Sequence, residues 1–491
     1  MGGTTIIDRN RRTKARRRWC VLAGALLVAL ATGAVGTSTA AARGLVTGFS
    51  DNALFDPTSV NPSTRATWLD RAVGARAGIV RITVNWRASV ASHPPARPTN
   101  PADPAYQFGH LDEAIKSARA HGLRVMLTVY RAPDWAEQGH KPRRIEPGAW
   151  KPDPAKFGQF GQALARRYSG HFQGLPRVRY FEAWSEPNLT QFLAPQWKGK
   201  KKAAPRRYRA MLNRFYSGVH AAQPGATVIG GATSPFGDSR KHPLYPGHPR
   251  MRPVVFLRTV LCLDGHLRRA KHCKQKPHLD ALSAHPLNFF NPPHYVPYNK
   301  NDIQVAVFRR VRKVLRAAKR ARTVRPGGHH SLWVTEEGLL SHPPNPKGVR
   351  PGKHARWLEE SLYLLWKQGA SVVMNLQIRD VAYDPHHVPS GQFTTGIYFH
   401  DGKAKPAVRA WRFPFVTHRK SKRRVSAWGK APQGGKLKIQ QKKRHGRHWR
   451  TRKRITVKAG QVFRRSFRLK GRATLRARVG KAKSLSWHQS G

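Results

Sequence analysis

The chain has 491 residues, of which 91 are Lys or Arg and 24 are Asp or Glu, so its formal net charge is +67. Such a charge is typical of nucleic-acid-binding proteins, because Lys and Arg displace counterions from phosphates. A general compositional habit of the source is the alternative explanation. The sequence has no Cys/His spacing that resembles a zinc site and no Gly-rich phosphate loop, so we expect no metal and no nucleotide cofactor.

Residues 1–42 have the pattern of a secretory signal peptide. A basic segment, Arg9–Arg18, precedes an apolar run from Trp19 to about Val35, and Ala40–Ala42 offers a small-residue cleavage site. The apolar run is short for a membrane span, and an uncleaved anchor is the alternative. We therefore expect a secreted, extracellular protein that has no stable membrane span and meets no nucleic acid. Its charge would then suit anionic cell-wall polymers or an acidic polysaccharide.

Residues 43–415 alternate short apolar strands with amphipathic helices, which predicts an α/β fold of the (β/α)8 TIM-barrel type. Helical periodicity is clear after Asp153-Pro154, which supplies an acidic N-cap and a proline in the first turn. A doubly wound open sheet is the alternative, but Gly48–Asp51 is not the Gly-rich first turn typical of that fold. The eight predicted strands are Leu45–Phe49, Val80–Val84, Arg124–Val129, Arg179–Trp184, Thr227–Gly231, Asp280–Ser283, Leu332–Thr335 and Val372–Leu376.

Cys20 lies in the predicted signal peptide, which leaves Cys262 and Cys273 as an even pair in an exported chain. We predict a disulfide between them, with two free buried thiols as the alternative.

Residues 416–491 differ in composition from the barrel. From Thr417 to Gly491 there are 26 Lys and Arg and no acidic residue. Apolar and basic residues alternate in several runs, and Gly434-Gly435 and Gly471 mark turns, so these runs are predicted to be strands. We expect a small C-terminal all-β module, similar to a β-sandwich, with a basic solvent face. Such a face could bind anionic cell-wall polymers.

Two short runs in the barrel each place a carboxylate just beyond a predicted strand. Arg179–Asn188 has the sequence RYFEAWSEPN, and Ser331–Gly338 has the sequence SLWVTEEG. Both are rich in aromatic and β-branched residues before they stop at Pro187 or Gly338, which is typical of a buried strand that ends at a loop. Two carboxylates brought together from distant strands can cleave a glycosidic bond, one as acid and the other as nucleophile.

Both runs also carry a family resemblance. Trp184–Asn188 resembles the Trp-Asn-Glu-Pro acid/base motif of the large barrel clan of retaining glycoside hydrolases, and Val334–Gly338 resembles the clan's Thr-Glu-x-Gly nucleophile motif. The nearest relatives are the cellulase-like family 5 and family 39, and the resemblance extends from about Gly48 to Phe415. It implies that Glu186 is the acid/base and Glu336 the nucleophile, without a cofactor.

The resemblance extends to residues that would bind substrate. Arg81 matches the family 5 arginine that orients the nucleophile, and a salt bridge within the barrel is its structural alternative. His285 matches the substrate-contacting histidine after strand six, although a lone histidine is often a satisfied core group. Trp86 and Trp135 could stack on sugar rings or simply pack. Ser185 stands where relatives have the asparagine that binds the sugar 2-hydroxyl, and it could reach that group through water.

Strand alternation adds two expectations about side-chain direction. Glu336 and Glu337 must point to opposite faces, and the motif selects Glu336 for the barrel mouth. Glu182, Trp184 and Glu186 should share a face, so Glu182 would point inward, where a buried carboxylate needs a cation such as Arg81.

The predicted function is a secreted retaining O-glycosidase that hydrolyses β-glycosidic bonds of a polysaccharide or oligosaccharide. The alternative is a noncatalytic carbohydrate- or cell-wall-binding protein on a degenerate barrel. Three departures from the family pattern motivate this alternative, namely Ser185, Leu287 in place of a tyrosine and Asn375 near the usual tryptophan of strand eight.

Overall fold

The computed structural model describes residues 44–55, 59–238, 249–386, 393–443 and 446–490. The predicted signal peptide, residues 1–42, lies outside this range. Within the described part of the chain, no helix has both the length and the apolar character needed to cross a membrane.

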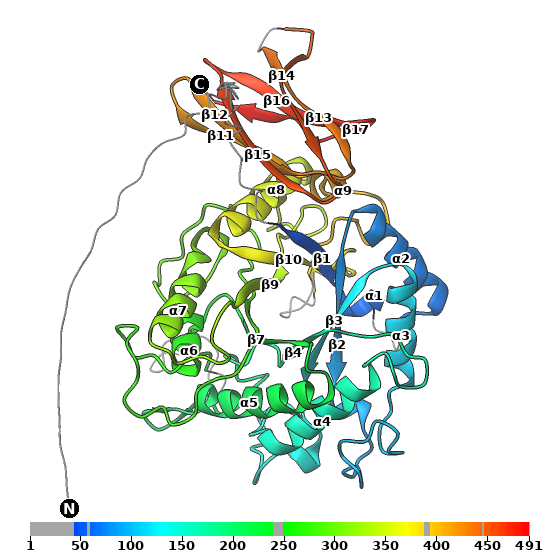
Figure 1. The fold of residues 1–491 in the computed structure, drawn as a ribbon, viewed down its shortest axis with the longest axis vertical. Helices are drawn as coiled ribbons and strands as arrows, with labels where there is room; N and C mark the ends of the chain where they lie inside the picture. The colour runs from blue at the N-terminus through cyan, green and yellow to red at the C-terminus, as the bar shows by residue number, and fades with distance from the viewer. Residues whose placement is uncertain (1–43, 56–58, 239–248, 387–392, 444–445, 491) are drawn as a thin grey trace, which may run out of the picture. The chain divides into compact units, whose positions relative to one another are not determined.

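Eight parallel strands form a closed barrel in the order β1-β10-β9-β8-β7-β4-β3-β2, which confirms the predicted TIM barrel (Figure 1). Each pair of neighbours is hydrogen-bonded in parallel, so the carboxyl ends of all eight strands meet at one end of the barrel. The strands are β1 (Val46–Ser50), β2 (Ile79–Asn85), β3 (Arg124–Tyr130), β4 (Tyr180–Ala183), β7 (Thr227–Thr233), β8 (Ala281–Ala284), β9 (Ser331–Glu337) and β10 (Ala370–Leu376).

Amphipathic helices cover the outside of the barrel. The side chain of Asp153 accepts hydrogen bonds from the backbone of Ala155 and Lys156, which caps α4 as predicted. Helix α8 ends at Gln368. The next residue, Gly369, has a φ of 122°, a conformation that favours glycine. The helices are α1 (Asn52–Phe55), α2 (Pro62–Gly74), α3 (Gly109–Ala120), α4 (Pro154–Arg167), α5 (Ala204–Ala222), α6 (Pro253–Val260), α7 (Arg309–Arg320), α8 (Pro351–Gln368) and α9 (Pro406–Arg412).

The interior of the barrel is divided into an apolar and a polar layer. Apolar side chains such as Ile79, Met126 and Trp333 form one buried cluster in the lower part of the barrel. Two residues further along the same strands, Arg81, Thr128 and Thr335 are also buried. Because alternate residues of a strand face the same side, the polar layer lies directly above the apolar one, toward the carboxyl ends.

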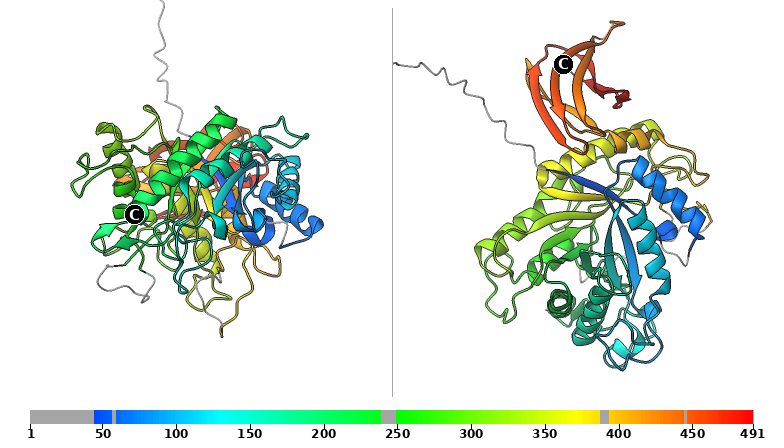
Figure 2. Two further views of the ribbon diagram at one scale, coloured as in Figure 1. Left: turned by 90° about the horizontal axis from the view of Figure 1, so that it is seen from below. Right: turned by 45° about the vertical axis from the view of Figure 1, so that its right-hand side comes forward.

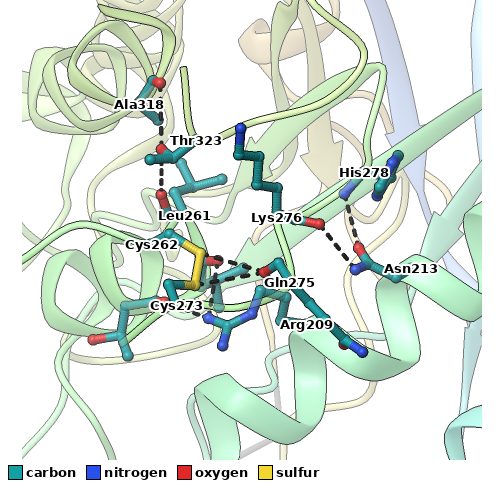
Figure 3. The surroundings of a disulfide bond; sticks show 12 residues. Arg209, Asn213, Leu261, Cys262, Cys273, Gln275, Lys276, His278, Ala318 and Thr323 are labelled. Atoms are coloured by element: carbon teal, nitrogen blue, oxygen red, sulfur yellow. Dashed lines mark hydrogen bonds between the residues drawn. A yellow bond between two sulfur atoms is a disulfide. The ribbon is translucent and has the colours of Figure 1, made fainter. Parts of the chain in front are cut away.

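The predicted disulfide between Cys262 and Cys273 is present, with a Cα–Cα distance of 5.6 Å (Figure 3). It lies in the segment between α6 and β8, which leads to the amino end of a barrel strand. The neighbouring Leu261 carbonyl accepts a hydrogen bond of 2.7 Å from Thr323 Oγ1. The disulfide is therefore a structural bond placed away from the carboxyl ends of the strands.

The C-terminal residues form the predicted all-β module. Two antiparallel sheets pack around one apolar core that includes Phe415, Leu437, Phe463 and Leu475. A strand that sequence patterning did not predict, β11, begins at Phe415. One sheet contains β11 (Phe415–Ser421), β12 (Arg424–Lys430) and β15 (Val462–Arg468); the other contains β14 (Arg450–Val457), β13 (Gly435–Lys443), β16 (Ala473–Val479), β17 (Ala482–Lys483) and β18 (Trp487–Gln489).

The module packs directly on the barrel, beside α8 (Figures 1 and 2). Trp428 of β12 is fully buried, and its ring centroid lies 5.5 Å from that of Tyr363 and 5.6 Å from that of Trp366, both on α8. Lys430 Nζ donates a hydrogen bond of 2.8 Å to Thr47 Oγ1 in β1. The module thus shares an apolar core with the barrel instead of being joined to it only by a linker.

Candidate active site

Glu186 and Glu336 lie together at the carboxyl ends of β4 and β9. His285, one residue beyond β8, lies between them, with Nδ1 3.0 Å from Glu186 Oε1 and 3.5 Å from Glu336 Oε2. One ligand-type atom from each of the three residues falls within 4.8 Å of the others. The two carboxylates are therefore close enough to act on the same bond of a substrate.

Backbone conformation at the end of β4 aims Glu186 into this cluster. The φ angles of Trp184 and Glu186 are 73° and 44°, in the left-handed region that costs non-glycine residues energy. The turn is held by a hydrogen bond of 2.8 Å from Glu186 N to the Ala232 carbonyl in β7. Residues in such strained conformations are concentrated at functional sites, where neighbouring structure fixes them.

This turn corrects the predicted direction of Trp184. The strand ends at Ala183, so alternation no longer applies, and Trp184 does not share a face with Glu182 and Glu186. Its ring is buried against Phe157 of α4, on the outside of the barrel, and its Nε1 donates to the Phe192 carbonyl at 2.8 Å.

An irregularity at the end of β9 directs two successive side chains into the barrel. The pairing of β9 with β10 shifts register between Val373 and Asn375, opposite Val334 to Glu337. Thr335 and Glu336 consequently both contact residues of the barrel interior. Glu337 is buried outside this interior, and burial raises the pKa of its carboxyl to about 7. Such bulges re-aim side chains next to active sites.

Arg81 connects Glu336 to the polar layer and has a side chain only 1% exposed. The charges of Glu336 and Glu182 outweigh burial and raise the pKa of the Arg81 guanidinium, so it remains a cation. A planar guanidinium that is bound on all sides cannot rotate, and it holds the Glu336 carboxylate in one orientation. Its acceptors are Thr128 Oγ1 (2.7 Å) and Glu182 Oε2 (3.2 Å) for Nε, Ser50 Oγ (3.0 Å) and Glu336 Oε1 for Nη1, and Ser185 Oγ (3.2 Å) for Nη2.

The two carboxylates have different electrostatic surroundings. Burial is the largest effect on Glu186 and, together with the Glu336 charge, raises the pKa of its carboxyl despite the nearby His285. Burial would lower the pKa of His285, but the charge of Glu336 and the hydrogen bond to Glu186 outweigh it and raise that pKa. The site therefore favours a proton on the Glu186 side of the cluster, away from the Arg81 cation that contacts Glu336.

Sequence analysis missed the three hydroxyls that complete this polar layer. Thr128, Ser283 and Thr335 all donate to Glu182, which is fully buried beneath the two carboxylates. The available signal was strand alternation, because each hydroxyl lies two residues along its strand from an apolar residue of the barrel interior.

The predicted substrate-binding residues lie in different environments. Ser185 is beside the carboxylates, is 9% exposed and accepts a hydrogen bond from Arg81. Trp135 is half-buried and follows β3 at the same end of the barrel. The prediction that Trp86 stacks on a sugar is wrong, because its ring is fully buried between Phe160, Phe157 and Trp135. Trp86 packs the barrel against α4.

The two other departures from the family pattern are also buried. Asn375 Nδ2 donates to the carbonyls of Gln377 (2.9 Å) and Thr395 (2.8 Å), so this side chain supports the segment after β10. Leu287 is 4% exposed.

A cavity of about 1060 Å³ lies between the segments that follow β3 and β4, at the same end of the barrel as Glu186. Its lining includes Trp150 and Trp197 and six basic side chains, among them Lys201 and Lys202, and no Asp or Glu among the described residues. Burial, then the charges of Arg258 and Arg206, lower the pKa of Lys202. Aromatic faces and cations are groups that bind sugar rings and their acidic substituents.

Glu186, His285 and Glu336 have the spacing of a metal site, and they are the one group of three potential ligands found in the described part of the chain. The Glu336 carboxylate, however, already binds the Arg81 guanidinium. A fixed cation at this position repels a metal ion and supplies the positive charge a metal would bring. The cluster therefore contains the groups that acid/base and nucleophilic chemistry requires.

The fold is similar to that of solved glycoside hydrolases. A family 39 glycoside hydrolase from the gut symbiont Bacteroides cellulosilyticus WH2 has a TM-score of 0.51 and 16% identity, covering 86% of this chain and 80% of that chain. A family 39 enzyme from Xanthomonas axonopodis pv. citri gives a TM-score of 0.47 at 15% identity, over 87% and 93% of the two chains. A family 5 enzyme from Streptomyces cattleya has a TM-score of 0.49 and 15% identity, covering 76% of this chain and 81% of that chain. At such identities the first comparison establishes the fold alone, a closed (β/α)8 barrel.

No family model and no curated protein matches the chain.

Proposed function

We propose that this protein is a retaining O-glycosidase that hydrolyses β-glycosidic bonds of a polysaccharide or oligosaccharide. The spacing of the carboxylates carries the proposal: Glu186 and Glu336 place oxygens within 4.8 Å of each other. Retaining enzymes have carboxyl groups about 5 to 5.5 Å apart, whereas inverting enzymes need about 6.5 to 9.5 Å to admit a water molecule. The similarity of the fold to glycoside hydrolases supports the same conclusion.

Each step of the proposed reaction has a residue suited to it. Glu186, whose pKa is raised by burial, donates its proton to the leaving oxygen while Glu336 attacks the anomeric carbon. The resulting glycosyl ester removes the negative charge of Glu336, and with it one cause of the raised pKa of Glu186. Glu186 then takes a proton from water, whose hydroxide attacks the anomeric carbon and releases Glu336.

The cavity beside the segments that follow β3 and β4 supports a carbohydrate partner with acidic groups. Six basic side chains and two tryptophans line the cavity beside β3 and β4. In a secreted protein, this lining and the basic module would suit acidic polysaccharides and anionic wall polymers. Secretion itself rests on the sequence of residues 1–42.

The test is hydrolysis of a panel of soluble neutral and acidic glycans by the mature protein, with Glu336→Gln as control. We expect release of sugar by the native protein and none by the variant, because an amide cannot form the glycosyl ester. Proton NMR of the first product should show the anomeric configuration of the substrate. Activity that survives in Glu336→Gln, or an inverted product, would reject the proposal. Binding without hydrolysis would favour a noncatalytic sugar-binding barrel.

A further inference from the structure

A buried carboxylate outside the catalytic pair connects the two halves of the site. Glu182 accepts hydrogen bonds from Arg81 Nε (3.2 Å), Thr128 Oγ1 (2.8 Å), Ser283 Oγ (2.7 Å) and Thr335 Oγ1 (2.9 Å), which come from four different strands. All four bonds are donated to the two carboxylate oxygens of Glu182, and one of the donors carries a full positive charge. Each of the three hydroxyls therefore uses its proton in its bond to Glu182.

This property determines the direction of the next hydrogen bond. Thr335 has a single hydroxyl proton, and it is used in the bond to Glu182. Thr335 Oγ1 also lies 3.1 Å from His285 Nε2, so in this second bond the hydroxyl oxygen must accept and Nε2 must carry a proton. The tautomer of His285 is thereby fixed by a residue that does not touch it.

The consequence reaches the acid/base residue. With Nε2 protonated, a neutral His285 presents the lone pair of Nδ1 to Glu186 Oε1 at 3.0 Å, and it can only accept the proton of Glu186. A charged His285 instead donates to the Glu186 carboxylate. In both states one proton lies between Glu186 and His285. Glu182 also binds Arg81, and Arg81 in turn orients Glu336.

We propose that Glu182 is a positioning residue that acts through Thr335 to fix the Nε2–H tautomer of His285, which keeps the catalytic proton shared between His285 and Glu186. The inference rests on the proposed function for its effect on turnover, but the tautomer itself is independent of any activity. The charged groups that face His285 are Glu186 from the end of β4, Glu336 from β9 and Arg81 from β2.

The decisive pair of variants is Thr335→Val and Thr335→Ser. Valine keeps the branched shape but cannot accept from Nε2, so His285 can adopt the Nδ1–H tautomer and donate to a deprotonated Glu186. This stabilises the Glu186 carboxylate, and the alkaline limb of kcat/KM should move to lower pH by roughly one pH unit. Serine keeps the hydroxyl and should restore the native limb. Thr128→Val is the matched control, because Thr128 also donates to Glu182 but has no hydrogen bond to His285.

Nitrogen NMR of protein carrying 15N-labelled histidine tests the tautomer directly. The His285 resonances are identified by their loss in His285→Gln. We expect Nε2–H in the native protein, Thr335→Ser and Thr128→Val, and Nδ1–H in Thr335→Val. Retention of Nε2–H in Thr335→Val, or an equal shift of the alkaline limb in Thr128→Val, would overturn the proposal. A protein without glycosidase activity but with the expected tautomers would reject the proposed function and leave this inference standing.

Discussion

Glu186 and Glu336 are both carboxylates, but they have different neighbours, which suits the different roles proposed for them. Glu336 binds the Arg81 guanidinium, whereas Glu186 faces a histidine and is affected mainly by burial. Pairs of titratable groups whose surroundings separate their pKa values are typical of acid/base catalysis.

The fall in kcat/KM caused by replacing Glu186 should therefore depend on the leaving group of the substrate. In Glu186→Ala we expect kcat/KM to fall by on the order of 100-fold or more for a substrate with a poor leaving group, because no acid protonates it. A substrate with an acidic phenol leaving group needs no proton and should be affected much less. Azide should restore turnover and give a glycosyl azide with the configuration of the substrate. Equal losses for both substrates would contradict the role of Glu186 as acid.

Arg81→Lys should separate charge from geometry. Lysine keeps the positive charge, but one ammonium group cannot reach Glu182, Glu336 and Ser185 at the same time, as the guanidinium does. We expect kcat to fall by on the order of 10- to 100-fold because Glu336 loses its fixed orientation. Steady-state kinetics with circular dichroism as a folding control measure this. A native kcat in Arg81→Lys would show that charge alone is sufficient.

Sequence alone placed several of these residues together for physical reasons. Alternation put Glu182 inside the barrel and required a cation, and the structure pairs it with Arg81. The same rule failed at Trp184, because alternation ends where φ becomes positive. Trp86 was misassigned because an aromatic residue after a strand has the same pattern whether it meets a sugar or the helix α4. The inward direction of Glu336, directly after the inward-facing Thr335, depends on a register shift that no local pattern reveals.

At the scale of elements, the eight barrel strands were predicted within two residues of their observed ends, because each is an apolar run between turn signals. Strand β11 was missed since its exposure does not alternate: Phe415 to Thr417 are buried and Lys420 and Ser421 exposed. The contact of β11 with α8 also could not be predicted, because it joins segments distant in the sequence.

The contact between α8 and β11 should make stability depend on pH. Glu359 of α8 is fully buried, accepts a hydrogen bond of 3.3 Å from Phe415 N, and has its pKa raised by burial from 4.5 to about 8. Between these values the folded protein keeps a proton that the unfolded chain releases. The free energy of unfolding should thus fall as pH rises from about 4.5 to about 8, by up to about 1.4 kcal/mol per pH unit for this group.

Urea unfolding at several pH values between 5 and 8 measures this dependence. Glu359→Gln should flatten the curve above pH 7, where more than half of Glu337, with a pKa of about 7, is already ionised. The neighbouring Glu360→Gln is the matched control and should keep the native slope. An unchanged slope in Glu359→Gln would exclude Glu359 as its source.

The disulfide is expected to stabilise the fold without affecting turnover. Cys262 and Cys273 are 11 residues apart, and closing such a loop is worth about 2 to 3 kcal/mol in the chain-entropy model. The double variant Cys262→Ala/Cys273→Ala should lose about that free energy of unfolding. Its kcat/KM should match the native value at 25 °C, because the bond lies away from the carboxyl ends of the strands. A large loss of kcat/KM in the folded variant would show a link to the site.

For the whole molecule, the basic module packs on the barrel and has the proposed second role of binding anionic polymers. The interface between the module and the barrel buries Trp428 and Lys430. Removing residues 417–491 should therefore lower the melting temperature of the barrel as well as its retention on anionic polymers. Deletion alone therefore cannot test electrostatic binding. Exposed charges on the strand β14 can be changed without altering the interface between the module and the barrel.

Reversal of three exposed charges, Arg452→Glu, Lys453→Glu and Arg454→Glu, should weaken co-sedimentation with an anionic wall polymer, most strongly at low salt, because exposed charges are screened beyond about 8 to 10 Å at physiological ionic strength. The melting temperature should stay within a few degrees of the native value. The control is the same reversal at Lys313, Arg316 and Lys319, exposed residues of α7 on the barrel. Equal loss in both triple variants would assign retention to net charge instead of the module.

The position of Trp428 near the end of the chain also has a consequence for biogenesis. The rings of Tyr363 and Trp366 on α8 receive their cover from a residue that is synthesised more than sixty positions later. Until β12 has been made, α8 carries an uncovered aromatic surface that attracts chaperones and proteases. Chains that stop before Trp428 are therefore expected to be degraded. Only chains that contain the module would then persist with a folded barrel.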